Sequence, residues 1–153
     1  MATDGDAALE LALRALGRRE RSSAELRSWL SDRGVAEDEA DVVVAHLEGI
    51  GQLDDARFAR RYADDKRELA GWGSERIGEA LLARGVAPEH IEAAMAADGP
   101  AEQCERAAAL LVRRAEPLDS ERARSRALGY LTRRGYSYEV AHDAVREYER
   151  ETR

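Results

Sequence analysis

The chain has 153 residues, of which 36% are charged and 5% aromatic, a composition that favours small apolar contacts between helices over a thick core. Its formal net charge of −7 argues against a protein that coats nucleic acid by neutralising phosphates. With one cysteine, Cys104, and no apolar run near the roughly 20 residues that span a bilayer, we expect neither a disulfide nor a membrane contact, but a cytoplasmic protein.

An arginine followed by a glycine recurs three times at nearly equal intervals along the chain. The glycines are Gly34, Gly85 and Gly135, at spacings of 51 and 50 residues. Glycine in this position is typical of a helix end at which the backbone turns into the left-handed conformation. Apolar residues recur before and after each glycine at the spacing of helical faces, so each glycine separates two helices. They are Leu26, Leu30, Ala40 and Val44; Ile77, Leu81, Ile91 and Met95; and Ala127, Leu131, Ala141 and Val145.

The first repeat is expected over residues 8–51, after a disordered tail at residues 1–7. Its first helix is predicted over residues 8–19, where leucines share one face. Ser22 and Glu25 have the spacing of a capping box, in which each side chain accepts a hydrogen bond from the main chain of the other. This pair predicts the start of a second helix.

The second repeat is expected over residues 52–99 and opens with the densest aromatic and basic sequence in the chain. Asp54 is placed to accept hydrogen bonds from the next turn as an N-cap, so a helix is predicted over residues 54–69. Leu53 and Phe58 then occupy the positions of a hydrophobic staple. The staple fixes the angle at which this helix enters the repeat.

A Gly-Trp-Gly sequence at residues 71–73 interrupts the second repeat, and Ser74 after it is predicted to cap the next helix. Pro88 suits the first position of the third helix. The third repeat is expected over residues 100–153, with Ser137 as the cap of its last helix. Each repeat thus carries three predicted helices.

The predicted fold is all-α, an elongated, curved array of three tandem three-helix repeats. A unit of about 50 residues in three short helices has little core of its own, so neighbouring repeats must support one another. We expect this array to be a monomer.

No group of side chains has the spacing of a catalytic or metal site. The carboxylate pairs at residues 54–55 and 64–65 are adjacent in a helix, where neighbours point about 100° apart and do not converge. His46, His90 and His142 lie at different distances from the three glycines and have no Cys or His at ligand spacing. We therefore predict a binding protein and not an enzyme, with no metal and no cofactor.

Two groups of basic residues are candidate partner-binding surfaces. Residues 1–50, 51–100 and 101–153 have net charges of −5, −3 and +1, so only the last third is not acidic. Arginines beside acidic residues also occur on solvated helix faces, and aromatic residues at helical spacing also occur in cores. Tyrosines among the arginines of the third repeat favour an interface there. The candidates are Arg57, Arg60, Arg61, Lys66, Arg67 and Arg76 in the second repeat and Arg122, Arg126, Tyr130, Arg133 and Arg134 in the third, within a wider group that includes Arg113 and Arg114.

Three sequence motifs together are similar to those of a known family. They are Gly-Gln-Leu-Asp-Asp-Ala-Arg-Phe-Ala at 51–59, Gly-Trp-Gly-Ser-Glu-Arg-Ile at 71–77 and Leu-Leu-Ala-Arg-Gly-Val at 81–86. With these motifs, the chain resembles the RecX family of bacterial recombination regulators over residues 8–148.

The resemblance implies a protein that binds the RecA recombinase filament on single-stranded DNA and lies in its helical groove. It implies inhibition of filament growth, ATP hydrolysis, strand exchange and coprotease activity, and so regulation of DNA repair and of the SOS response. The candidate residues named above would then contact the filament or its DNA. Glu68-Leu69-Ala70 stands where family members carry a stronger basic run, so only weak direct contact with DNA is expected.

Two other functions stay open at the level of sequence. Three-helix modules resemble helix-turn-helix units, so the alternative is a stand-alone nucleic-acid-binding protein whose affinity falls steeply with salt. The other is a helical scaffold or adaptor for a different protein partner.

Overall fold

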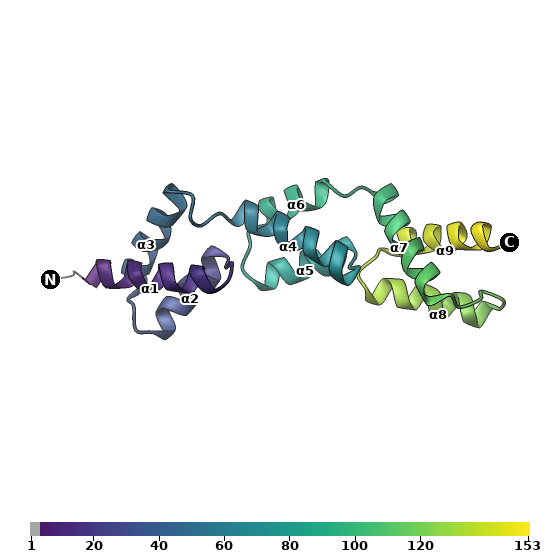
Figure 1. The fold of residues 1–153 in the computed structure, drawn as a ribbon, viewed down its shortest axis with the longest axis horizontal. Coiled ribbons are helices and arrows are strands. Elements are labelled where there is room, and N and C mark those ends of the chain that lie inside the picture. Colours follow the sequence, from purple (N-terminus) through teal and green to yellow (C-terminus); the bar gives the residue numbers. More distant parts are fainter. Residues whose placement is uncertain (1–3) are drawn as a thin grey trace. The chain divides into compact units, whose positions relative to one another are not determined.

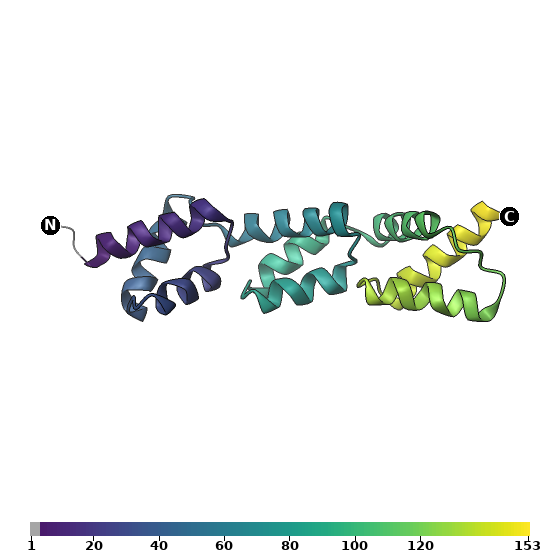
Figure 2. The same ribbon diagram turned by 60° about the horizontal axis from the view of Figure 1, so that its bottom comes forward.

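The computed structural model describes residues 4–153, and within this range the secondary structure is helical, with no strand. Figure 1 and Figure 2 show the helices in two orientations. They are α1 (Asp4–Arg18), α2 (Ser23–Asp32), α3 (Glu37–Gly49), α4 (Asp55–Ala70), α5 (Ser74–Ala83), α6 (Pro88–Ala96), α7 (Pro100–Arg114), α8 (Glu121–Arg133) and α9 (Tyr138–Thr152). The predicted all-α array of three-helix repeats is confirmed, because the helices follow the predicted order.

The first helix begins earlier than expected. The sequence suggests a tail over residues 1–7, but residues 4–7 form the first turn of α1. Residues 1–3 of that tail lie outside the described residues. Asp4 and Asp6 lie near the positive end of the α1 dipole, which explains why this acidic segment is helical.

Side chains cap several helices as predicted. Ser22 Oγ accepts the amide of Glu25 at 3.1 Å, and Glu25 Oε1 accepts the amide of Ser22 at 3.1 Å, which confirms the capping box before α2. Asp54 Oδ1 accepts the amide of Arg57 at 3.0 Å before α4. This bond lowers the pKa of Asp54, because the ionised carboxylate is the better acceptor. Ser137 Oγ likewise accepts a hydrogen bond from the amide of Val140, at 3.2 Å, and so caps α9.

Ser74 does not cap α5, so that prediction is wrong. The helix begins at Ser74 itself, and the Ser74 Oγ is buried without a hydrogen-bond partner among residues 4–153. The carbonyl oxygen of Gly135 accepts the amide of Glu75 at 3.0 Å, and that of Arg134 accepts the amide of Gly73 at 2.8 Å. Main chain from the following repeat therefore takes the place of a side-chain cap.

The repeated glycines have the left-handed backbone that their position predicts. Their φ angles are 84° at Gly34, 80° at Gly85 and 100° at Gly135. The apolar stripe before each glycine is buried, as predicted. In the second repeat the stripe after the glycine differs, because Ala94 rather than Ile91 is fully buried there.

Two apolar cores hold the first three and the last three helices. In the N-terminal core, alanines of α1 pack with leucines and valines of α2 and α3. In the C-terminal core, residues of α7, α8 and α9 pack together with two buried tyrosines. Alanines opposite larger residues fill the space between closely packed helices. The N-terminal core comprises Ala8, Ala12, Ala15, Leu26, Leu30, Ala40, Val43, Val44, Leu47 and Leu53; the C-terminal core comprises Ala107, Ala108, Leu111, Ala127, Leu131, Tyr136, Val140, Ala141, Ala144, Val145 and Tyr148.

The chain divides into two compact units that do not follow the three predicted repeats. The first unit comprises Met1–Arg61 and Leu81–Ile91, and the second comprises Tyr62–Ala80 and Glu92–Arg153. The division runs through α4, α5 and α6, so the second repeat is shared between the units. The repeat boundaries and the elongated, curved shape stay predictions.

Each unit contains one junction between repeats, built on an Arg-Gly pair. In the first unit, Ser22 Oγ donates to the carbonyl oxygen of Arg84 at 2.6 Å, and a Cβ added to Gly85 would lie 2.4 Å from the Cβ of Ala24. In the second unit, the main-chain bonds from the start of α5 to the Arg-Gly pair of the third repeat have this role. The Arg-Gly turn of one repeat therefore packs on the start of the second helix of the preceding repeat.

Candidate interaction surface

The first three candidate arginines lie on α4 in the first unit, among acidic residues. Arg57 is half-buried, and its Nη2 donates to the carbonyl oxygen of Gly51 at 3.2 Å. Arg61 forms an ion pair with Glu20. Arg60 is exposed. Two of these three guanidinium groups are therefore already engaged within the protein.

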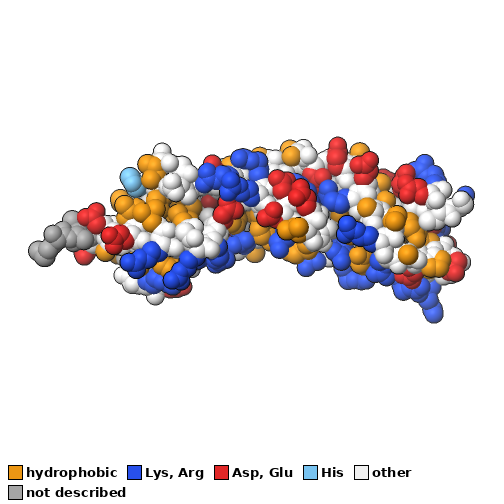
Figure 3. Space-filling view, viewed as in Figure 1, with side chains coloured by type: hydrophobic (Ala, Val, Ile, Leu, Met, Phe, Trp, Pro, Cys, Tyr) orange, Lys and Arg blue, Asp and Glu red, His pale blue; other side chains and the backbone are white. Residues whose placement is uncertain are grey.

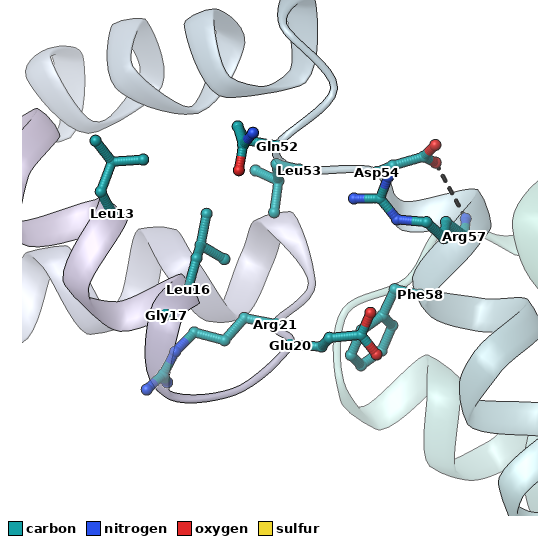
Figure 4. A pocket seen from close by; sticks show the side chains of 10 residues that line it. All are labelled: Leu13, Leu16, Gly17, Glu20, Arg21, Gln52, Leu53, Asp54, Arg57 and Phe58. Carbon is teal, nitrogen blue, oxygen red and sulfur yellow. Dashed lines mark hydrogen bonds between the residues drawn. The ribbon is translucent and has the colours of Figure 1, made fainter.

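A cavity of about 200 Å³ lies beside these arginines, between α1 and the start of α4. Leu16 and Leu53 line its apolar side, and Figure 4 shows their side chains pointing toward one another. Arg57 and Glu20 also line it, so charges of both signs meet there. Leu53 and Phe58 are 3% and 6% exposed, which agrees with their predicted structural role.

Lys66 and Arg76 lie on the indole ring of Trp72 in the second unit. The Lys66 Nζ is 4.6 Å from the ring centroid, and the Arg76 Cζ is 4.1 Å from it. The same ammonium lies 5.4 Å from the ring centroid of Tyr62. Cations at such distances are attracted by the face of an aromatic ring. The fold thus brings together the two candidate cations that flank Gly-Trp-Gly, and we name Lys66, Trp72 and Arg76 the tryptophan cluster.

Arg67 supports the fold rather than an exposed surface. Its side chain is 9% exposed, its Nε lies 3.3 Å from Asp98 Oδ2, and its Nη2 donates to the carbonyl oxygen of Ala94 at 3.1 Å. The carboxylate of Asp98 also accepts two hydrogen bonds from Arg106, at 2.9 and 2.8 Å. One buried carboxylate therefore holds two guanidinium groups and joins α4 to α7.

An open groove of about 570 Å³ lies among the end of α4, α7 and α8. Five arginines and one glutamate line it, together with Leu69, which is 84% exposed. We name it the arginine groove. Its lining residues are Arg67, Glu68, Leu69, Ala70, Gly71, Arg106, Ala109, Leu110, Arg113, Arg114, Tyr130 and Arg134.

Tyr130 is the aromatic residue of the arginine groove. The Cζ atoms of Arg114 and Arg134 lie 4.1 and 4.9 Å from its ring centroid. Arg134 also donates through Nη1 to a carbonyl oxygen at the end of α4 at 2.6 Å, which fixes its position. Arg114 pairs with Glu116 at 3.0 Å, whereas Arg113 is exposed and adds further positive charge to the lining.

Comparison with known proteins identifies the family. Residues 8–47 match the first three-helix domain of RecX, and residues 54–95 match the second. The regulatory protein RecX of Mycobacterium ulcerans is 39% identical over 141 residues, which cover 88% of this chain and 80% of the relative. The chain belongs to the RecX family.

Other RecX proteins extend the likeness along the chain. The regulatory protein RecX of Thermus thermophilus is 35% identical over 142 residues, or 93% of this chain and 92% of the relative. The crystal structure of RecX from Lactobacillus salivarius has a TM-score of 0.87 at 21% identity and covers 97% of this chain and 99% of its own, which shows a shared fold. The two RecX domain matches lie within residues 8–95, so α7 and α8 of the arginine groove fall beyond them.

The remaining candidates of the predicted third repeat lie outside the arginine groove. Arg122 and Arg133 are exposed on α8. Arg126 pairs with Glu116 at 2.8 Å, and its hydrogen bonds lower the pKa of that carboxyl group. Of the third-repeat candidates, Tyr130 and Arg134 are the two that line the groove.

Arg106 and Leu110 line the groove but are absent from the sequence-based candidates. Together with Arg113 they are spaced i, i+4 and i+7 on α7, so one face of this helix carries them. This spacing can be read from the sequence and would have placed the three residues on one helix face. Leu69 has no such signal, because it meets this face of α7 only through the fold.

Charges of both signs cover the molecule. On the face drawn in Figure 3, acidic side chains lie among the basic ones in both units. Within residues 4–153, no group of three His, Cys, Asp or Glu side chains is placed to hold a metal ion. No helix in this range is long and apolar enough to cross a bilayer. Burial raises the pKa of the Cys104 thiol, and the charge of Asp143 adds to the shift.

Proposed function

We propose that this protein binds the RecA recombinase filament on single-stranded DNA and restrains its growth. In this role it lowers ATP hydrolysis, strand exchange and filament-stimulated repressor cleavage, and so regulates DNA repair in the cytoplasm. Membership of the RecX family carries the proposal, because relatives at 39% and 35% identity bear the name regulatory protein RecX. The protein acts as a monomer that occupies a surface of the filament.

The arginine groove supports this proposal as a contact site. It contains a tyrosine and several arginines, residue types that are enriched in binding hot spots, beside an exposed leucine, Leu69. Arg134 is already held by the main chain and loses little freedom when a partner binds. The tryptophan cluster lies in the same unit and supplies Lys66 and Arg76 as further contacts. Several weak contacts to a polymer of identical subunits then act together.

A titration of RecA filaments on single-stranded DNA tests the proposal. The protein is added up to one copy per recombinase subunit while ATP hydrolysis and sedimentation are followed. We expect hydrolysis to fall and the protein to sediment with the filaments. Unchanged hydrolysis, with the protein left in the supernatant at that ratio, would contradict the proposal.

Direct binding of nucleic acid is a second candidate function, favoured by the position of Tyr130 in the arginine groove. Grooves that bind single strands track the phosphate backbone with positive charge and stack bases on aromatic rings. The net charge of −7 opposes such binding. If the groove binds naked single-stranded DNA, the affinity must fall steeply with salt, and a lack of binding at low salt removes this candidate.

A further inference from the structure

The first unit carries a groove of a different kind, which the proposed function does not use. It lies between α1 and α3 and has a volume of about 390 Å³. Figure 3 shows hydrophobic side chains gathered over these two helices, with acidic side chains beside them. We name it the α1–α3 groove. Its lining residues are Gly5, Asp6, Leu9, Asp38, Glu39, Val42, Val43 and His46.

The floor of the α1–α3 groove is apolar and partly uncovered. Val42 is 70% exposed near the middle of α3, while the adjacent Val43 is 4% exposed and belongs to the N-terminal core. Leu9 of α1 is half-buried and packs against the same core. The floor is therefore part of the packed N-terminal core. A partner that covers Val42 removes apolar surface from water.

Acidic side chains border this groove at the starts of both helices. Asp6 lies in the first turn of α1, and Asp38 and Glu39 lie in the first turn of α3. The dipole of α3 favours Asp38 and Glu39 at these positions, although a partial charge of about half a unit does not neutralise two carboxylates. No lysine or arginine occurs among the described residues that line the groove. The groove therefore favours a cation and repels an anion.

We propose that the α1–α3 groove binds an amphipathic helix of a partner protein, with lysine or arginine beside its apolar face. Grooves of this kind accept the i, i+3, i+4 and i+7 positions of a helix. The acidic border selects against acidic helices and against nucleic acid by like-charge repulsion. The arginine groove of the second unit has the opposite charge, so the two surfaces select different partners. This interaction is separate from filament binding and does not depend on it.

Two synthetic helical peptides test the proposal on the full chain. Both carry leucine at i, i+3, i+4 and i+7 and a fluorescein label; one has lysines beside the leucines and the other has glutamates at the same positions. Binding is followed by fluorescence anisotropy. We expect the lysine peptide to bind at least about tenfold more tightly than the glutamate peptide, and its affinity to fall with salt. Equal affinity of the two peptides overturns the proposal.

A pair of matched variants locates the binding. Val42→Lys places a positive charge in the α1–α3 groove, whereas Val112→Lys changes a valine of similar exposure, 52% against 70%, on α7 in the second unit. We expect Val42→Lys to weaken binding of the lysine peptide about tenfold or more, because it removes an apolar contact and repels the lysines, and Val112→Lys to leave that binding unchanged. Equal effects of the two substitutions overturn the assignment of the site.

Two further measurements keep the test decisive. If circular dichroism shows that Val42→Lys loses helicity, methyl resonances of Val42 and Val43 in the unmodified protein replace it as the readout. Shifts confined to these methyl groups on addition of the lysine peptide support the proposal, and their absence overturns it. If sedimentation shows that the protein self-associates and Val42→Lys abolishes this, the groove is an interface between copies, and the proposal of a basic partner helix is wrong.

Discussion

Ser22 Oγ donates a hydrogen bond of 2.6 Å to the carbonyl oxygen of Arg84 and so joins the start of α2 to the turn after α5. The same hydroxyl accepts the amide of Glu25 as the cap of α2, and Ser22 is fully buried. Glu25 in turn pairs with Arg84 at 3.1 Å. One hydroxyl thus begins a helix and links two repeats.

Replacement of Ser22 by alanine removes both bonds. We expect Ser22→Ala to lower the free energy of unfolding by about 2–3 kcal/mol, because the helix loses its cap and the Arg84 carbonyl loses a partner. Ser137→Ala is the matched control, since it removes a cap alone and should cost about 1 kcal/mol. Urea denaturation measures both values. Equal losses for the two variants would show that the bond to Arg84 adds nothing.

The contact between the turn after α5 and the start of α2 also predicts that alanine substitutions at the repeated glycines have different costs in stability. Gly34→Ala introduces a Cβ with nothing within 4 Å, so its cost is that of the left-handed backbone, roughly 1–2 kcal/mol. Gly85→Ala adds a clash, because its Cβ would lie 2.4 Å from that of Ala24. We expect a clearly larger loss of unfolding free energy for Gly85→Ala in the same urea titration. A loss no larger than that of Gly34→Ala would contradict the close packing at this junction.

Substitution of Asp98 should lower the free energy of unfolding more than substitution of most other residues in the second unit. Asp98→Ala leaves the guanidinium groups of Arg67 and Arg106 without their carboxylate, and the loss of one partner in a buried ion pair costs roughly 3–5 kcal/mol. Asp119→Ala removes an exposed carboxylate and should change the free energy of unfolding by no more than about 0.5 kcal/mol. Thermal or urea unfolding compares the two, and similar stability of both variants would argue against a structural role for Asp98.

Tyr136 makes stability depend on alkaline pH. Burial raises the pKa of its phenol above the ordinary value of 10.0, although the charge of Arg106 opposes the shift. The hydroxyl donates to the carbonyl oxygen of Gly71 at 3.0 Å and needs its proton to do so. The folded state therefore holds this proton more tightly than the unfolded chain does. The contribution of the protonated Tyr136 phenol to stability is fully present below about pH 10 and is lost as the pH rises through the pKa of the folded state.

Tyr136→Phe separates this effect from other titrations. Near neutral pH the variant should be less stable by roughly 1 kcal/mol, because one hydrogen bond is lost. Above pH 10 the unfolding free energy of the unmodified protein should fall more steeply than that of the variant. Parallel pH profiles of the two proteins would exclude Tyr136 as the source of the alkaline dependence.

Features that depend on residues close in sequence could be predicted from it. The Arg-Gly period, the helix order and the caps at Ser22 and Asp54 are of this kind. Ser74 shows the limit, because serine before a helix is a common cap, yet at this position the carbonyl oxygen of Gly135 accepts the hydrogen bond. A hydrogen-bond acceptor that comes from another repeat cannot be recognised from the residues next to the helix start.

The candidate site depends still more on the tertiary fold. Leu69, Arg113 and Tyr130 come from α4, α7 and α8 and line one groove only after these helices pack. Arg67 has the sequence context of a surface cation, but burial and Asp98 give it a structural role. Charge pattern alone could locate the basic segments and could not separate the arginines that face solvent from those that hold helices together.

Cosedimentation with RecA filaments on single-stranded DNA tests most directly the claim that the arginine groove is the filament contact. The double variant Leu69→Glu with Arg113→Glu puts negative charge in the groove and spares the arginines that hold the fold. Arg146→Glu is the control, since it reverses an exposed arginine of α9 outside the groove. We expect the double variant to bind filaments at least about tenfold more weakly and Arg146→Glu to bind like the unmodified protein. A double variant of normal helicity that sediments with filaments as well as the unmodified protein would contradict this account.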